Sequence, residues 1–218
     1  MNREARRCLL LDLGKVLVAV NYEEFARRMK RLTGLDPGQL QAMFAAGQLG
    51  KRFEAGLISG RDFFDEICRR TGACLDFEAF AAAWNSMIGP PMIADSLLAD
   101  LARRTRLWII SNTNEMHYRH MTGRFDFLRR FEGCVLSYEV GVAKPDARIF
   151  RAALERMQAP ASQVVFVDDL EANVAAARAL GIDAFRFLDP DQFASELAAR
   201  GLLLKAPNLR EGGGHDQH

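Results

Sequence analysis

Several features that would point to particular protein classes are missing from this chain of 218 residues. No apolar run approaches the length of about 20 residues that a membrane-spanning helix needs. The formal net charge is only +1, so neither a basic surface for nucleic acid nor an acidic, disordered chain is predicted. Residues 1–7 are charged, but the apolar run behind them is too short for a signal peptide. These absences predict a cytoplasmic globular protein with no membrane or nucleic-acid partner.

Cysteine is also scarce, and its spacing predicts no metal centre. The chain has four cysteines, Cys8, Cys68, Cys74 and Cys134, and no pair has the Cys-x-x-Cys spacing of a zinc site. We interpret them as buried, reduced thiols. Hydrophobic residues make up 49% of the chain and charged residues 26%, which is ordinary for a globular protein. No internal repeat is visible, so the length fits one domain with a sizeable insert.

A short aliphatic stretch near the N-terminus contains the first candidate for chemistry. Residues 9–11 are all leucine, Asp12 follows them, and Gly14 provides a turn signal. This pattern predicts a buried central strand with Asp12 at its carboxyl end, the edge at which open α/β sheets bind ligands. A carboxylate there can attack phosphorus, or a carbon that bears a leaving group. The alternative is an aspartate that only caps a turn.

The remaining chain divides into a helical stretch and an alternating stretch. Helical spacing with stop signals predicts four helices between residues 19 and 89, over 22–32, 37–46, 59–71 and 76–87. Gly89-Pro90-Pro91 is the predicted exit hinge of this insert. Beyond it, helices alternate with aliphatic strands predicted at 107–111, 134–137, 164–168 and 184–187.

This alternation predicts an α/β fold with a Rossmann-like parallel sheet flanked by helices on both faces. We expect an α/β core formed by residues 1–18 and 90–205 and an inserted all-helical cap formed by 19–89. The segment 206–218 contains three consecutive glycines and is predicted to be a flexible tail.

Polar residues also follow the other predicted strands: Ser111, Asn112, Lys144, Asp168 and Asp169. Because the carboxyl ends of parallel strands share one edge, we expect them to converge on Asp12. The set suits phosphoryl transfer with Asp12 as nucleophile and a divalent cation between Asp12 and Asp169. Oxygen ligands favour Mg²⁺. The Ser111 hydroxyl and nearby backbone N–H groups would bind phosphate oxygens, and Lys144 would supply positive charge.

Four short motifs in this order resemble those of the haloacid dehalogenase (HAD) superfamily: Asp12-Leu13-Gly14, Ser111-Asn112, Lys144-Pro145 and Asp168-Asp169. The likeness covers nearly the whole chain, and the helical insert resembles the C1 cap of subfamily I. The sequence segments around these motifs are similar to those of the bacterial α-D-glucose-1-phosphate phosphatase branch. Each motif alone is common in unrelated proteins, but the four in order, each at a predicted strand end, are specific.

The resemblance implies a role for each motif residue. Asp12 would be the nucleophile, Ser111 with Asn112 would bind phosphate, and Lys144 would orient both Asp12 and phosphate. Asp169 would be a direct Mg²⁺ ligand, and Asp168 would be a ligand or would support one. The backbone carbonyl of Gly14 would complete the protein ligands, a role that needs no side chain.

Two residues depart from the family pattern. Most phosphatases of the superfamily carry a second aspartate, a general acid, where this chain has Gly14. Its absence disfavours poor leaving groups by roughly 10²- to 10⁴-fold, so we expect a bias toward sugar 1-phosphates, acyl phosphates and aryl phosphates. The next position, usually Gly or Asn, is Lys15. Its ammonium group would help to bind phosphate, crowd the metal, or point into solvent.

Several residues of the helical insert and of the helix predicted over 113–122 are also candidates. The predicted specificity residues, if the insert closes over the site, are Arg52, Phe53, Trp84 and Asn85, together with Lys15. His117 and His120 lie three residues apart without a third metal ligand, so we interpret them as an exposed helix face.

The sequence therefore predicts a Mg²⁺-dependent phosphatase acting on a small phosphorylated metabolite, such as a sugar phosphate, through an aspartyl-phosphate on Asp12. A haloacid dehalogenase is the first alternative, although Asp168 and Asp169 would repel a carboxylate substrate. A phosphomutase would need the aspartate that Gly14 replaces. A catalytically weak binding module with the same fold is the last alternative. The oligomeric state, monomer or homodimer, stays open.

Overall fold

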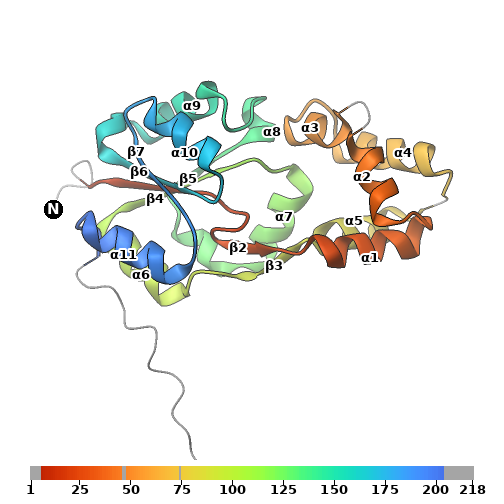
Figure 1. Ribbon diagram of the computed structural model, residues 1–218, viewed down its shortest axis with the longest axis horizontal. Coiled ribbons are helices and arrows are strands. Elements are labelled where there is room, and N and C mark those ends of the chain that lie inside the picture. Colours follow the sequence, from red (N-terminus) through yellow and green to blue (C-terminus); the bar gives the residue numbers. More distant parts are fainter. Residues whose placement is uncertain (1–5, 46–47, 74, 204–218) are drawn as a thin grey trace, which may run out of the picture.

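The computed structural model describes residues 6–45, 48–73 and 75–203. A five-stranded parallel sheet runs through one half of the molecule in the order β5-β4-β1-β6-β7 (Figure 1). Its strands are β1 (Cys8–Leu11), β4 (Arg106–Ser111), β5 (Gly133–Leu136), β6 (Val164–Asp168) and β7 (Asp183–Arg186). The leucine-rich strand β1 is central, as predicted, because it pairs with β4 on one side and β6 on the other.

Alternate residues of β1 pack against opposite helical layers. Leu9 and Leu11 join the cluster that includes α6 (Asp95–Arg104), α7 (Glu115–Arg124) and α11 (Pro190–Ala199). Cys8 and Leu10 join the cluster that includes α9 (Ala147–Met157) and α10 (Glu171–Arg178). Side chains alternate along a strand, so a continuous aliphatic run buries both faces of the sheet. The predicted Rossmann-like α/β fold, with helices on both faces, is confirmed.

The second half of the molecule is helical. Between β2 (Val18–Val20) and β3 (Ile88–Pro91) lie α1 (Tyr22–Thr33), α2 (Pro37–Ala45), α3 (Leu49–Glu54), α4 (Gly60–Thr71) and α5 (Phe77–Asn85). Their sequence signals are local: α1 ends at Gly34 in the left-handed conformation, and Ser59 with Asp62 forms a capping box at α4. We name α1–α5 the helical region.

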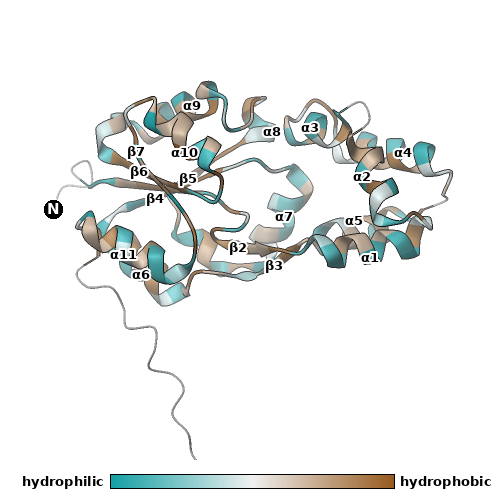
Figure 2. Ribbon diagram, viewed as in Figure 1, coloured by the Kyte–Doolittle hydropathy of each residue, from teal (hydrophilic) through white to brown (hydrophobic). Residues whose placement is uncertain are grey.

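The helical region has an apolar cluster of its own. Phenylalanine rings dominate it, and Phe53 and Phe63 stack with their centroids 4.4 Å apart. In Figure 2 hydrophobic segments face the interior and hydrophilic segments face outward in both halves. Periodicity predicted α1, α2, α4 and α5 but missed α3 and the four-residue helix α8 (Ser137–Val140), which are too short for a clear apolar stripe.

The segment predicted as a proline hinge is a strand. Ile88–Pro91 pairs with Val18–Val20 in a two-stranded antiparallel ribbon, which joins the helical region to the core (Figure 1). Proline lacks an amide hydrogen, but the outer side of a two-stranded ribbon needs no donor, so it is tolerated there. The connection is therefore a hydrogen-bonded pair of strands and not a free loop.

Two sequence expectations concern chain regions outside this description. Segment 206–218, predicted to be a flexible tail, and Cys74 lie outside the described residues. Of the other cysteines, Cys8 is buried while Cys68 and Cys134 are partly exposed, and all three are free thiols. Within the described ranges, no helix has both the length and the apolar character required to cross a bilayer.

Candidate active site at the edge of the parallel sheet

Asp12 is held at the carboxyl end of the central strand. Its backbone N–H donates to the Val167 carbonyl of β6 at 3.1 Å, which continues the sheet pairing by one residue. Its carboxylate is turned back on the chain, because Oδ1 accepts the Leu13 N–H at 2.7 Å. The residue is only 8% exposed. Strand pairing therefore fixes the position of a nearly buried carboxylate at the sheet edge.

The Lys144 ammonium lies between two carboxylates. Its Nζ is 2.8 Å from Asp12 Oδ1 and 2.7 Å from Asp168 Oδ2, and it also donates to the Ile110 carbonyl at 3.0 Å. Burial alone would lower the pKa of Lys144, but the two carboxylates raise it above its ordinary value. The ammonium group therefore stays charged, and two hydrogen bonds together with the ion pair to Asp12 fix its direction.

Asn112 holds the backbone of Lys144. Its side-chain Oδ1 accepts the Lys144 N–H at 2.7 Å, and its Nδ2 donates to the Lys144 carbonyl at 2.9 Å. The sequence predicted Asn112 as a phosphate-binding residue. Its side-chain amide positions Lys144, and the residue also lines the cavity described below. The predicted phosphate contact stays a prediction.

The adjacent acids Asp168 and Asp169 have different surroundings. Asp168 is fully buried, and its Oδ1 accepts hydrogen bonds from the Leu170 N–H at 2.9 Å and from Asn173 Nδ2 at 2.8 Å. With Lys144 on its other oxygen, all of its contacts are structural. The side chain of Asp169 is 20% exposed, and it lines the cavity described below. Asp169 is therefore the more available of the two for a ligand.

The donor set at this edge fits a divalent cation. Oxygen atoms of Asp12, Asp168 and Asp169 lie within 4.8 Å of one another. Burial raises the pKa of Asp12 above its ordinary value despite Lys144, and burial together with the Asp168 charge raises the pKa of Asp169. Excess negative charge is thus confined in a poorly solvated place. A hard cation with oxygen ligands would relieve it.

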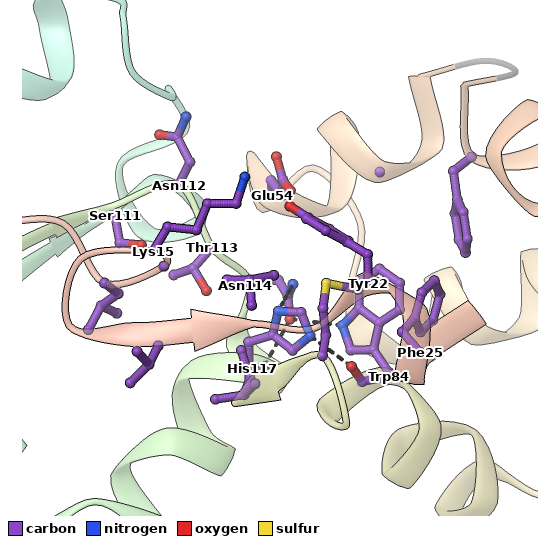
Figure 3. A pocket seen from close by; sticks show the side chains of 18 of the residues that line it. Lys15, Tyr22, Phe25, Glu54, Trp84, Ser111, Asn112, Thr113, Asn114 and His117 are labelled. Atoms are coloured by element: carbon purple, nitrogen blue, oxygen red, sulfur yellow. Dashed lines mark hydrogen bonds between the residues drawn. The ribbon is translucent and has the colours of Figure 1, made fainter. Parts of the chain in front are cut away.

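Lys15 occupies a backbone conformation that favours other residues. Its φ is +60°, in the left-handed region where Gly and Asn are common, which explains why those residues are typical of this position. Its half-exposed side chain extends into the cavity: Nζ lies 4.0 Å from Asp169 Oδ2 and 5.6 Å from the Tyr22 ring centre (Figure 3). The Lys15 side chain thus lies at the acidic edge and is half exposed to solvent, so the three sequence-based alternatives stay predictions.

A cavity of about 1110 Å³ opens from the sheet edge into the helical region. Asp12, the buried Ser111, Lys144 and Asp169 line one end, which we name the floor. The other end is lined by residues of α1, α2 and α5, and Figure 3 shows Phe25 and Trp84 there, across from Ser111 and Thr113. The residues predicted from separate strand ends therefore share one cavity.

Comparisons with known proteins agree with this arrangement. Residues 88–181 match the family model of haloacid dehalogenase-like hydrolases. A HAD family enzyme from Bacteroides thetaiotaomicron superposes with a TM-score of 0.80 at 26% identity, covering 88% of this chain and 98% of that one. The same enzyme has been solved in complex with magnesium and inorganic phosphate, with a TM-score of 0.75, 28% identity, and 84% and 94% coverage.

By fold and by the match over residues 88–181, the chain is similar to the haloacid dehalogenase-like hydrolases. Among curated relatives, mouse (Mus musculus) acyl-CoA dehydrogenase family member 10 is 35% identical over 78% of this chain, but the match is 17% of that protein. A sesquiterpene phosphatase of Aspergillus oryzae is 27% identical over 64% of this chain and 72% of its own length. The chain spans about a fifth or less of the first curated relatives it matches.

A buried polar network joins the helical region to the core. The Asn114 side chain caps α7 by accepting the His117 N–H at 3.0 Å, and it also accepts Trp84 Nε1–H at 3.4 Å. His117 Nε2 lies 3.1 Å from the Trp84 carbonyl, and Nδ1 lies 3.2 Å from Asn114 Nδ2. One neutral tautomer, with the proton on Nε2, satisfies both contacts. Burial accordingly lowers the pKa of His117 to about 4.

This network corrects one sequence expectation. His117 was expected on an exposed helix face, yet it is 8% exposed and stacks on Trp84 with ring centres 5.1 Å apart. His120, three residues on, is partly exposed. The sequence carried a signal that favoured burial: Met121 follows His117 by four residues, which places an apolar residue on the same helix face.

Three predicted specificity residues lie away from the cavity. Phe53 is buried in the apolar cluster of the helical region, where it stacks on Phe63. On α3, Gly50 and Glu54 line the cavity, whereas Arg52, two residues from each, is exposed on another side of the helix. Asn85 follows Trp84 directly in α5, so its side chain points about 100° away from that of Trp84 around the helix axis. It lines a separate hollow with His120. Trp84 and Lys15 do line the main cavity.

Proposed function

We propose that the chain is a Mg²⁺-dependent phosphatase that cleaves phosphate monoesters through an aspartyl-phosphate on Asp12. The observation that carries the proposal is the floor, where Lys144 contacts Asp12 and three carboxylates lie within 4.8 Å at the end of a large cavity. The magnesium and phosphate complex of the Bacteroides enzyme and the similarity to the Aspergillus oryzae sesquiterpene phosphatase support it.

Asp12, Asp169 and the Gly14 carbonyl would hold Mg²⁺, while Asp168 keeps its contacts with Lys144 and Asn173. The cation would offset the repulsion between the Asp12 carboxylate and a phosphate dianion. The Ser111 hydroxyl lines the same floor and would donate to a phosphate oxygen. Lys144 would hold Asp12 in its reactive orientation and supply positive charge where negative charge develops.

Two displacements at phosphorus complete the reaction. An Asp12 oxygen attacks phosphorus, and the bond from phosphorus to the ester oxygen breaks, which gives an aspartyl-phosphate and an alkoxide or phenoxide. Water then attacks the phosphorus of this intermediate, releasing inorganic phosphate and restoring the Asp12 carboxylate. Gly14 carries no acid to protonate the leaving oxygen. The proton must come from water, so esters with good leaving groups should react faster.

The helical region would act as a cap that excludes water and supplies specificity, over the residue range 19–89 expected from the sequence.

The dehalogenase alternative would use the same Asp12 to attack carbon without a metal. Asp168 and Asp169 disfavour it, because they would repel the carboxylate of a haloacid. Three expectations from the sequence remain predictions: a sugar phosphate as the substrate, a monomeric or dimeric state, and a cytoplasmic location.

The decisive experiment measures phosphate release from aryl, acyl, alkyl and sugar phosphates with Mg²⁺ or with a chelator. We expect Mg²⁺-dependent release that falls by at least about 10⁴-fold in Asp12→Asn. Asp126→Asn is the matched control, because the Asp126 side chain is 91% exposed and far from any contact with the floor. Release that is unaffected by chelator or by Asp12→Asn would contradict the proposal. Metal-independent halide release from a 2-haloacid would favour the dehalogenase.

A further inference from the structure

The cavity above the floor is walled by apolar side chains. Six of them come from the two-stranded ribbon and from α1, α2 and the end of α5: Val20, Phe25, Leu40, Phe44, Met87 and Ile88. Trp84 lies beside them, with its ring centre 5.3 Å from that of Phe25 and 5.7 Å from that of Phe44. A substrate that reaches from the floor into this end of the cavity would therefore contact mostly aromatic and aliphatic carbon.

The buried polar groups at this end are already bonded to one another. Asn114 and His117 line the cavity, but both His117 nitrogens and both side-chain groups of Asn114 are used within the network with Trp84. The charged lining residues of α1, Glu23, Arg27 and Lys30, are exposed to solvent. Glu54 of α3 also lines the cavity and is partly buried. A sugar ring here would lose water from several hydroxyl groups and would find this one carboxyl group outside the network in exchange, which is unfavourable.

We infer that the organic group of the substrate is largely apolar, an alkyl, isoprenoid or aryl phosphate rather than a sugar phosphate. The inference rests on the proposed function for the floor and adds the identity of the group that the cavity wall contacts. The floor would bind the phosphate dianion, and the apolar wall would bind the hydrocarbon. A cavity of about 1110 Å³ exceeds the volume of many small-molecule sites, which have about 300–1000 Å³, so a bulky hydrocarbon can be accommodated.

Binding of alkylphosphonates tests the wall separately from catalysis. Ethyl-, butyl-, hexyl- and octylphosphonate cannot be hydrolysed, so calorimetric titration in the presence of Mg²⁺ reports affinity alone. Because burial of one CH₂ is worth about 0.8 kcal/mol, we expect Kd to fall by up to about fourfold for each added carbon. Kd values that do not change with chain length would overturn the inference.

Phe44→Asn and Phe77→Asn form a matched pair of variants. Both rings are partly buried and pack on the same aromatic cluster, but only Phe44 lines the cavity. Phe44→Asn should weaken octylphosphonate binding by about tenfold and make affinity less dependent on chain length. Phe77→Asn should keep the wild-type dependence. Equal effects of the two variants would contradict a direct role of Phe44. The wild-type series decides the question even if Phe44→Asn fails to fold.

Turnover then separates failure of the inference from failure of the proposed function. Octyl phosphate and 2-naphthyl phosphate represent the aliphatic and aromatic classes, and glucose 1-phosphate represents sugars. A lower KM for either apolar ester than for glucose 1-phosphate supports the inference and identifies the class, whereas kcat also follows the leaving group. A lower KM for glucose 1-phosphate than for both apolar esters overturns the inference and leaves the phosphatase proposal intact. Chain-length-dependent binding without phosphate release from any ester would instead contradict the phosphatase proposal.

Discussion

The two ends of the cavity bury opposite kinds of side chain. At the floor, Lys144 has the carboxylates of Asp12 and Asp168 within 2.8 Å. Strand ends hold the two carboxylates, and the loop between α8 and α9 holds Lys144. At the helical end, Phe25, Phe44 and Trp84 meet through ring contacts with centres less than 6 Å apart. The floor depends on directional hydrogen bonds from a rigid sheet edge. The helical end depends on shape and apolar area, which tolerate substitution more readily.

This contrast suggests how the two ends divide their tasks. A phosphate dianion is the same in every ester, so a fixed set of charges can serve all substrates. The organic group varies, and a wall of packed helices can be altered without disturbing the charges. The network of Trp84, Asn114 and His117 departs from this division, because it is a buried polar cluster at the apolar end. The first prediction concerns it.

We expect acid to destabilise the protein through His117. Burial lowers its pKa to about 4 in the folded state, against about 6.5 when unfolded. Between these values the unfolded chain binds the extra proton, so the free energy of unfolding falls as pH drops from 6.5 toward 4. The full shift corresponds to about 3 kcal/mol for this nearly buried group. Urea unfolding of wild type and His117→Gln between pH 7 and pH 4 measures the difference.

Glutamine keeps a donor at the end of the side chain but does not titrate in this range. The difference in unfolding free energy between wild type and His117→Gln should therefore change with pH, while carboxylates common to both cancel. His120→Gln is the control, since the His120 side chain is partly exposed and makes none of the network contacts. A pH-independent difference for His117→Gln would show that this histidine does not titrate on unfolding.

Gly14→Asp tests the missing acid of the floor. An added Cβ would meet only Val20 Cγ2, at 3.3 Å, so the side chain can be accommodated with a small shift. A carboxyl group there would protonate the leaving oxygen, and we expect kcat for alkyl phosphates to rise by about tenfold or more, with less gain for aryl phosphates. Gly14→Asn has nearly the same size without an acidic proton and should gain nothing. Equal gains for both ester classes would argue against general acid catalysis.

The sequence predicted the sheet and the residues at its edge because each depends on short-range signals. An aliphatic run followed by Asp12 implies a buried strand with a carboxylate at its end, and parallel pairing then brings Lys144 and Asp169 to the same edge. The roles of the side chains depended on longer-range contacts. Asn112 contacts Lys144 across 32 positions, and His117 contacts Trp84 across 33, so neither partner was visible locally.

The helical end was predicted less fully for the same reason. Periodicity located most of the helices, but it could not show which face of α3 or α5 borders the cavity. Arg52 and Asn85 were therefore proposed together with Trp84, whereas Trp84 and the unpredicted Glu54 line the cavity. The Ile88–Pro91 strand was missed because prolines are poor strand formers except at an edge, and the edge exists only once Val18–Val20 pairs with it.

Lys15 lies between the two ends and should have the smallest effect. Its ammonium is 4.0 Å from Asp169 Oδ2 and half exposed, so the attraction is worth at most about 1 kcal/mol. Lys15→Asn removes a competing cation and suits the positive φ, so we expect Mg²⁺ to bind up to about fivefold more tightly. Lys15→Arg keeps the charge and should bind Mg²⁺ as wild type does.

Calorimetric Mg²⁺ titration at low and high ionic strength measures this change, which should shrink as salt screens the exposed charge. The same titrations with inorganic phosphate distinguish competition with the metal from assistance to the anion. Weaker phosphate binding in Lys15→Asn, with unchanged Mg²⁺ affinity, would mean that Lys15 contributes to the charged floor. Tighter Mg²⁺ binding with unchanged phosphate affinity would mean that the positive charge of Lys15 opposes Mg²⁺ binding by Asp12 and Asp169. Phosphate binding at the floor would then not require Lys15.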